Sequence, residues 1–158
     1  MVLVEPKIPP NTGNVARLCA VTGSRLHLVA PLGFRLDDKD LRRAGLDYWN
    51  KVHAATWSSF DELLEGEKVP SEKLHLFTGR GRTPLWQARF HAGDWLVLGD
   101  EVGGLPPELL DRFPGRQVRV PMIENPAARS LNLSTCAGIA VFEALRQIVG
   151  PQQAGETG

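Results

Sequence analysis

The stretch WLVLGDEVGGLPPELLDRF (95–113) passes from an apolar run through a glycine-rich loop into a helix-like pattern that opens with proline. A continuous apolar run is typical of a strand buried on both faces, as in a parallel sheet. Proline favours the first turn of a helix. The stretch therefore predicts a strand at 95–99 and a helix at 106–113. This order indicates the α/β class, in which a mostly parallel sheet is flanked by helices.

The same alternation continues on both sides of this stretch. Apolar runs predict further strands at 2–5, 25–30, 73–78 and 117–122, the last strand of the chain. Helical spacing predicts helices at 11–23, 37–45, 58–67 and about 131–149. Pro9 and Pro10 are expected to stop the segment before the first of these helices, Asn11 or Thr12 to cap it, and Gly23 to end it. A serine is expected to cap helix 58–67.

Length and composition favour one soluble domain. The 158 residues, 42% of them hydrophobic, suffice for a core, so we expect a single domain over 1–150 and a mobile tail over 151–158. The 18 basic and 18 acidic residues cancel, which excludes an electrostatic grip on nucleic acid by the whole molecule but allows local basic patches. No membrane span or leader pattern is found, so a cytoplasmic location is expected.

Neither the cysteines nor the histidines indicate a metal site. Cys19 and Cys136 lie among apolar, helix-like neighbours, which favours free buried thiols over a disulfide or a reactive centre. The histidines lack the spacing of metal ligands. They are His27, His53, His75 and His91.

The final predicted helix is apolar over a wide arc. Ile139 and Phe142 fall outside its main stripe. Such a helix either lies deep in the core or supplies a partner interface, and its place near the chain end favours an interface. The stripe consists of Leu133, Ala137, Ala140, Val141, Ala144, Leu145 and Ile148.

Three polar clusters lie where a strand is followed by a helix. They are NTGNVAR (11–17), LGDEVGGLP (98–106) and ENPAARSLNLS (124–134). Ligands of open α/β sheets bind at this edge. Each cluster also has a plain structural interpretation: an N-cap with a tight turn, a flexible helix entry with a favourable acid, and a cap at Ser130. No dinucleotide fingerprint, P-loop or nucleophile elbow occurs. The residues alone indicate a ligand-binding domain with a polar site built from three loops.

Together with RRAGLDYW (42–49) and VRVPM (118–122), these clusters resemble, in order and spacing, the motifs of the SPOUT superfamily of RNA methyltransferases. The resemblance is to the branch that methylates ribose 2′-oxygens, and within it to small enzymes acting on cytidine or uridine at wobble position 34 of tRNA. It covers residues 1 to about 150. One such motif is weak evidence, whereas five in register are specific.

The resemblance implies a fold, a cofactor and a partner. The fold would be an α/β sheet with a C-terminal trefoil knot, an exception to the rule that chains do not knot. S-adenosylmethionine would be held in the knot by main-chain groups, in a homodimer whose sites combine loops from two chains. The implied cradle consists of Phe77, Thr78, Gly79, Gly99, Glu101, Gly104, Val120, Met122, Ser130, Leu131 and Asn132.

The functional polar set implied by the resemblance consists of Asn11, Arg17, Glu101, Ser130 and Asn132. Methyl transfer is an in-line displacement that depends on positioning of the 2′-oxygen and needs no metal. The family's arginine at the position of Arg17 is proposed to take the hydroxyl proton. Because a guanidinium group is always charged, we expect Arg17 to hold a flanking phosphate and stabilise the developing alkoxide. The other residues are expected to orient Arg17, the ribose and the cofactor.

The sequence departs from the family at Gly103, where many relatives carry Arg or Lys. The missing cation affects how the protein binds its substrate. Arg129, or Lys and Arg residues of the facing subunit, are candidates to replace its positive charge. The dimer itself would recognise RNA, which favours an exposed single-stranded target such as the anticodon loop. Tyr48 and Trp49 would stack on bases or pack in the core. The basic residues expected on the RNA surface are Lys39, Arg42, Arg43, Arg80 and Arg82.

Two other functions stay open at this stage. One is 2′-O-methylation of ribosomal RNA. The other is a non-catalytic RNA-binding protein that keeps the knot and has lost the chemistry, to which Gly103 alone points.

Overall fold

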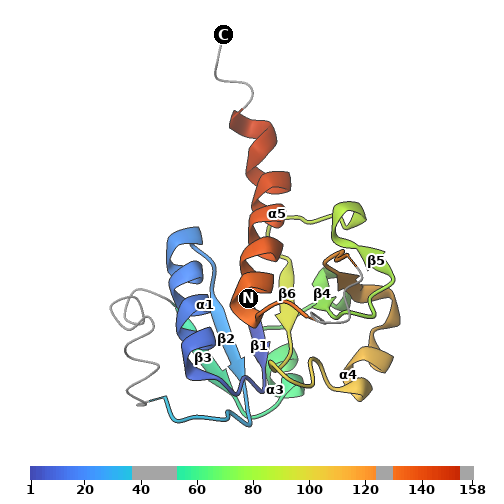
Figure 1. Cartoon of the computed structure of the whole chain (residues 1–158). Helices are drawn as coiled ribbons and strands as arrows, with labels where there is room; N and C mark the ends of the chain where they lie inside the picture. Colours follow the sequence, from blue (N-terminus) through green and yellow to red (C-terminus); the bar gives the residue numbers. More distant parts are fainter. Residues whose placement is uncertain (37–52, 124–129, 154–158) are drawn as a thin grey trace.

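A computed structural model describes residues 1–36, 53–123 and 130–153 (Figure 1). It confirms the α/β class. In chain order the elements are β1 (Val2–Val4), α1 (Pro9–Thr22), β2 (Leu26–Val29), β3 (Ala54–Trp57), α3 (Phe60–Gly66), β4 (Leu74–Phe77), β5 (Thr83–Pro84), β6 (Trp95–Leu98), α4 (Pro107–Arg112), β7 (Gln117–Arg119) and α5 (Leu133–Gln153).

Seven strands form one sheet of order β3-β2-β1-β6-β4-β7-β5. Every pairing between neighbouring strands is parallel, which confirms the predicted parallel sheet. The carboxyl ends of β4, β6 and β7 therefore lie at the same edge of the sheet, and the loops that follow these strands meet there.

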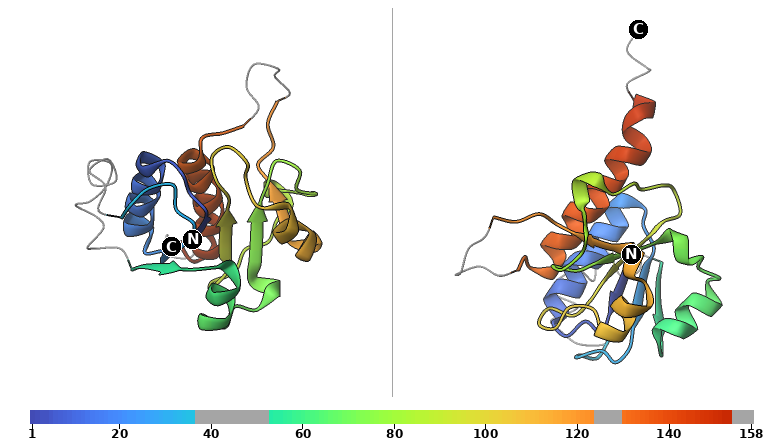
Figure 2. Two further views of the ribbon diagram at one scale, coloured as in Figure 1. Left: turned by 90° about the horizontal axis from the view of Figure 1, so that it is seen from below. Right: turned by 90° about the vertical axis from the view of Figure 1, so that its right-hand side faces the viewer.

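Side chains alternate across the sheet and divide the core into two layers. Leu3 belongs to the cluster that packs under α1 and α5, whereas Val2 and Val4 belong to the cluster that packs under α3 and α4. Figure 2 shows α1 and α5 on one face of the sheet and α3 on the other. Because both faces are covered, the strands are apolar at successive positions, as the run at 95–99 predicts.

The ends of α1 and α5 differ from the prediction. Pro9 and Pro10 occupy the first turn of α1 and do not stop the segment before it, since this turn leaves N–H groups unpaired in any case. The N-cap is Ile8, without a side-chain cap, so the predicted cap at Asn11 or Thr12 is wrong. The predicted end at Gly23 is confirmed. α5 begins at Leu133, after the predicted cap at Ser130, and extends to Gln153.

Two strands have no counterpart in the prediction. β3 is an edge strand of only four residues, Ala-Ala-Thr-Trp, whose side chains are exposed or only partly covered. β5 has two residues. Both depend on hydrogen bonds to a neighbouring strand, which local sequence does not encode. The predicted helix 37–45 and residues Lys39, Arg42, Arg43, Tyr48, Trp49 and Arg129 lie outside the described residues.

The part of α5 over Leu133–Gly150 is long and apolar enough to cross a membrane, judged by length and composition alone. Core helices of globular domains also have this length and composition. The side chains of α5 that are buried in the core beside α1 are those of Leu133, Ala137, Ala140, Val141 and Ala144. The helix therefore gives no argument for a membrane location. The trefoil knot stays a prediction, because the connection from β7 to α5 includes residues 124–129, which the structure does not describe.

Candidate active site

A cleft of about 650 Å³ opens at the carboxyl ends of β4, β6 and β7. Ten of the eleven residues of the cradle that the resemblance implies line it: Phe77, Thr78, Gly79, Gly99, Glu101, Gly104, Val120, Met122, Ser130 and Leu131. Apolar side chains of Leu98, Leu105 and Leu110 complete the wall. Its size is within the range of small-molecule sites. Segments far apart in the chain thus converge on one hollow.

The loop between β6 and α4 forms one wall and is closed upon itself. Asp100 and Gly104 exchange two backbone hydrogen bonds of 3.1 Å each. A Cβ on Gly99 would lie 2.0 Å from the carbonyl carbon of Gly104, so only glycine allows the two arms to approach this closely. The Asp100 carboxylate accepts the N–H groups of Val102 at 2.7 Å and Gly103 at 2.8 Å. The wall is therefore built mainly from main-chain groups held in one conformation.

Glu101 ties this loop to the start of α1. Its carboxylate accepts the backbone N–H groups of Lys7 at 2.9 Å and Ile8 at 3.2 Å. In a capping box, an acid within the helix accepts the N–H of the N-cap residue. Here a residue from a distant loop does so, and its negative charge suits the positive end of the helix dipole. The two N–H donors therefore fix the position of the Glu101 carboxylate, which accepts both hydrogen bonds.

A chain of side-chain amides joins Glu101 to the start of α5. The Asn11 amide nitrogen donates to Glu101 at 3.1 Å, and the Asn11 oxygen accepts from Asn132 Nδ2 at 2.9 Å. Asn132 Oδ1 accepts the backbone N–H groups of Ser134 at 2.9 Å and Thr135 at 3.4 Å, as an N-cap residue does. Because a carboxylate only accepts, the orientation of both amides follows along the chain. Three residues of the predicted polar set therefore form one hydrogen-bond network.

Lys7 adds an ion pair to the same loop. Its Nζ lies 2.9 Å from Asp100 Oδ2, and half of the Lys7 side chain is exposed. Burial alone would raise the pKa of Asp100, but the Gly103 N–H and the Lys7 ammonium outweigh this and lower it. Hydrogen bonding to Asp100 raises the pKa of Lys7. The sequence analysis missed Lys7, since no local pattern links it to a loop more than ninety residues away.

The remaining predicted site residues lie differently. Ser130 is exposed and lines the cleft. Arg17 is exposed on α1 and is not among the residues that line the cleft of its own chain. Asn11 and Asn132 are not among the residues that line the cleft, but both belong to the hydrogen-bond network that reaches Glu101, which does line it. Arg80, which was expected on the RNA surface, also lines the cleft.

Thiol and metal chemistry find little support among the described residues. Cys19 and Cys136 are free, as predicted, and burial raises the pKa of each thiol to about 11. A thiol in this state is a poor nucleophile. Within the described ranges, no group of three or more His, Cys, Asp or Glu residues is placed to hold a metal ion.

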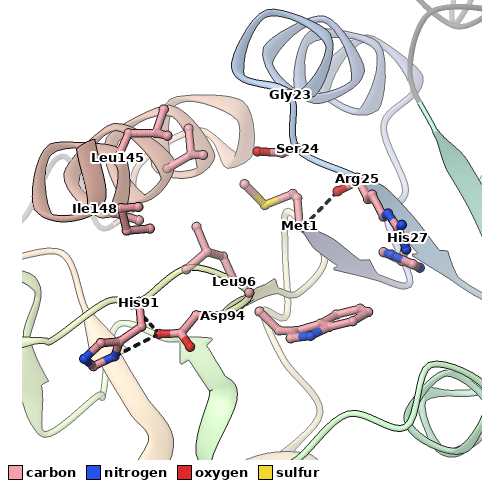
Figure 3. Close-up of a pocket in the computed structure, with 14 residues that line it drawn as sticks. Met1, Gly23, Ser24, Arg25, His27, His91, Asp94, Leu96, Leu145 and Ile148 are labelled. Atoms are coloured by element: carbon pink, nitrogen blue, oxygen red, sulfur yellow. Dashed lines mark hydrogen bonds and ion pairs between the residues drawn. The ribbon is translucent and has the colours of Figure 1, made fainter. Parts of the chain in front are cut away.

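A second hollow of about 370 Å³ lies at the opposite edge of the sheet (Figure 3). Met1 donates from its amino group to the Arg25 carbonyl there, and Leu145 and Ile148 of α5 face into the hollow. This is the amino end of β1, β2 and β6, whereas ligands of α/β sheets bind at the carboxyl end. The first cleft is therefore the candidate active site.

Comparison with known proteins identifies the family of the chain. A profile of the SpoU rRNA Methylase family matches residues 1–142. The chain belongs to the SpoU methylase family. A protein of Polaromonas sp. (strain JS666) named tRNA (cytidine(34)-2′-O)-methyltransferase is 51% identical over 148 residues, which are 93% of this chain and 89% of that protein.

Two solved structures show the same fold. One, from a study of 2′-OH methylation of C/U34 on tRNA, is 45% identical, has a TM-score of 0.87 and matches 94% of this chain and 95% of its own. An AdoMet-bound rRNA methyltransferase from Sinorhizobium meliloti is 24% identical, with a TM-score of 0.78 over 92% of this chain and 54% of that one. At this identity the second likeness shows the fold alone.

Proposed function

We propose that the chain methylates the ribose 2′-oxygen of the wobble nucleotide, cytidine or uridine 34, in the anticodon loop of tRNA, with S-adenosylmethionine as donor. The observation that carries this proposal is the convergence of ten residues from separate segments of the chain on one cleft at the carboxyl ends of the strands. The relatives named for position 34 support the choice of substrate. A cytoplasmic location suits an enzyme that acts on tRNA.

The cleft suits S-adenosylmethionine in size and chemistry. Its walls combine main-chain groups of 77–79 and 99–104 with the apolar side chains of Leu98, Leu105 and Leu110, as expected for a nucleoside with a polar tail. When bound, S-adenosylmethionine supplies the methyl group. Phe77–Gly79, Gly99, Gly104, Val120, Met122 and Ser130–Leu131 would hold it.

The network behind the wall positions the reacting groups. Glu101 accepts three N–H donors, from Lys7, Ile8 and Asn11, and so fixes the glycine loop against α1. Asn132 fixes the start of α5 against the same point. Rigid placement of the loops is what an in-line displacement requires, because much of its rate comes from orientation. Ser130, exposed at the cleft, is placed to orient the ribose.

Arg17 would act across a homodimer. Since it does not line the cleft of its own chain, we assign it to the cleft of a second copy, where its guanidinium holds a flanking phosphate and stabilises the alkoxide as the proton leaves. Exposed apolar side chains on the two helices, Val21 at 66% and Phe142 at 57% exposure, support such an interface.

Two experiments test the proposal. Labelled S-adenosylmethionine is incubated with total tRNA and with ribosomal RNA, and the methylated nucleoside is mapped. Label in ribosomal RNA alone would show that ribosomal RNA, the substrate after which the family is named, is the substrate instead of tRNA. Calorimetry with S-adenosylmethionine identifies a non-catalytic RNA-binding protein, which would bind none.

The dimer is tested by mixing two impaired variants at an S-adenosylmethionine concentration too low for the weakened cleft of Gly99→Ala. Arg17→Ala and Gly99→Ala chains are co-expressed with different tags and purified as the mixed pair. If each site takes Arg17 from one chain and the cleft from the other, one of the two sites of the pair is intact and activity returns. An inactive mixed pair, or a monomer by light scattering, contradicts the shared site.

A further inference from the structure

A strongly basic segment runs from the cleft to the edge of the sheet. Residues 78–89, TGRGRTPLWQAR, contain three arginines and no acid, although the whole chain has a net charge of zero. Arg80, Arg82 and Arg89 are all exposed. Among the described residues, no carboxylate pairs with any of these three guanidinium groups. The segment is therefore a local positive surface whose charges are not neutralised by neighbours.

The same segment exposes a large aromatic side chain. Trp86 is 62% exposed in the short 3₁₀ turn Leu85–Gln87, whereas its neighbours Leu85 and Ala88 are buried. A single exposed hydrophobic residue is common on protein surfaces and carries no argument by itself. Trp86, however, lies four residues after Arg82 and three residues before Arg89. An indole ring close in sequence to two guanidinium groups is a more specific signal for RNA, because the ring can stack on a base while the cations contact phosphates.

Backbone contacts hold this surface rigid. Gln147 of α5 donates to the Ala88 carbonyl at 3.0 Å and accepts the Phe90 N–H at 3.0 Å. At the other end, Arg119 of β7 donates to the Gly81 carbonyl at 3.2 Å. Strand β5 lies between these anchors as the edge strand beside β7 (Figure 1). A rigid platform loses little entropy when it binds a flexible ligand.

The surface is continuous with the candidate active site. Thr78, Gly79 and Arg80 line the cleft, and the Thr78 N–H donates to the Val118 carbonyl at 2.9 Å, next to the pairing of β5 with β7. Along the chain, Arg80 at the cleft is followed by Arg82 and then, after β5, by the turn that carries Trp86 and by Arg89. The basic segment therefore begins at the cleft and continues over the edge strand β5.

We propose that Arg82, Trp86 and Arg89 form a binding platform for single-stranded RNA beside the reacting nucleotide, which we name the β5 platform. The arginines contact phosphates, and Trp86 stacks on an unpaired base. This proposal rests on the proposed function and adds the part of the protein that selects an exposed loop over a duplex, since bases inside a duplex offer no free face to an indole ring.

The test uses Trp86→Ala and Trp86→Phe, with Gln87→Ala as matched control, since Gln87 is exposed in the same turn and uncharged. Binding of an anticodon stem–loop RNA is followed by fluorescence anisotropy, and KM and kcat by methyl transfer. Trp86→Ala is expected to weaken RNA binding and raise KM by about tenfold with kcat and S-adenosylhomocysteine affinity retained. Trp86→Phe keeps most of the affinity, because a phenyl ring still stacks. Gln87→Ala behaves as the parent protein.

Two further readouts distinguish stacking from a structural role. RNA is expected to quench the tryptophan fluorescence of the parent protein, and Trp86→Phe is expected to remove the part of this quenching that comes from Trp86 while it still binds. Arg89→Ala lowers the slope of log affinity against log salt by about 0.7, the value for one phosphate contact on a single strand. Unchanged RNA affinity in Trp86→Ala, or equal quenching in Trp86→Phe, overturns the platform. Because these readouts need no methyl transfer, they are separate from failure of the proposed reaction.

Discussion

Gly99→Ala is expected to open the loop that forms one wall of the cleft. The added Cβ would lie 2.0 to 2.2 Å from the carbonyl group of Gly104 and the nitrogen of Leu105, where ordinary contacts begin at 3.4 Å. Relief requires the two arms to part by more than an ångström. The two hydrogen bonds between Asp100 and Gly104, now 3.1 Å each, would then both be broken. At about 0.5 to 1.5 kcal/mol per bond, the closed loop loses about 1 to 3 kcal/mol.

This cost appears in cofactor binding, because the closed loop lines the cleft. If binding must close the loop again, the affinity for S-adenosylhomocysteine falls by the same free energy, about 5- to 150-fold. Isothermal calorimetry measures it. Gly103→Ala is the control in the same loop, because its Cβ would meet only the movable carboxylate of Asp100, at 3.1 Å. Equal product affinity for the two variants would refute the reasoning.

Three further predictions concern the network and the pH dependence. Asn132→Ala loses the N-cap of α5, so the free energy of unfolding measured by urea titration should fall by about 1 kcal/mol. Asn132→Asp keeps a cap but loses the N–H donor to Asn11, so it should lower kcat while the stability is retained. Hydrogen bonds from Arg146 hold the pKa of Glu143 at about 2, so its contribution to stability, present above the ordinary value of 4.5, should be lost as pH falls towards 2; acid unfolding of Glu143→Gln that matches the parent would contradict this. Burial lowers the pKa of His27 to about 4, so stability should rise between pH 4 and 6.5, and an NMR titration with a midpoint near 6.5 would exclude this contribution.

The parts of the fold that sequence predicted are those with strong local patterns. The run at 95–99 becomes β6, buried between two layers. Ser59 caps α3 by accepting the Glu62 N–H at 3.1 Å, as the serine and acidic first turn of 58–67 predict. The apolar stripe of α5 was also found, but the interface favoured for it is not what the structure shows, since the stripe packs in the core beside α1. Hydrophobic period and cap residues act over a few neighbours, so one sequence suffices to find them.

In the candidate site, too, some residues were assigned from the sequence and other contacts became visible only in the structure. The cofactor residues were assigned by resemblance, and the fold brings ten of these eleven residues to one cleft. The partners of Glu101 followed from no pattern, because Lys7 and Ile8 lie more than ninety residues away and contribute only backbone N–H groups. The edge strands β3 and β5 were missed because neighbouring strands supply their hydrogen bonds.

By itself, the sequence determined the α/β class, the order of most elements and which loops carry polar groups, since these depend on periodicity and turn chemistry. Only the tertiary structure decided that Glu101 caps α1, that Asn11 links two helix starts, and that Arg17 lies apart from the cleft of its own chain. The physical reason is that hydrogen bonds and ion pairs between distant segments depend on where the parallel sheet places the loops, and no local pattern records that distance.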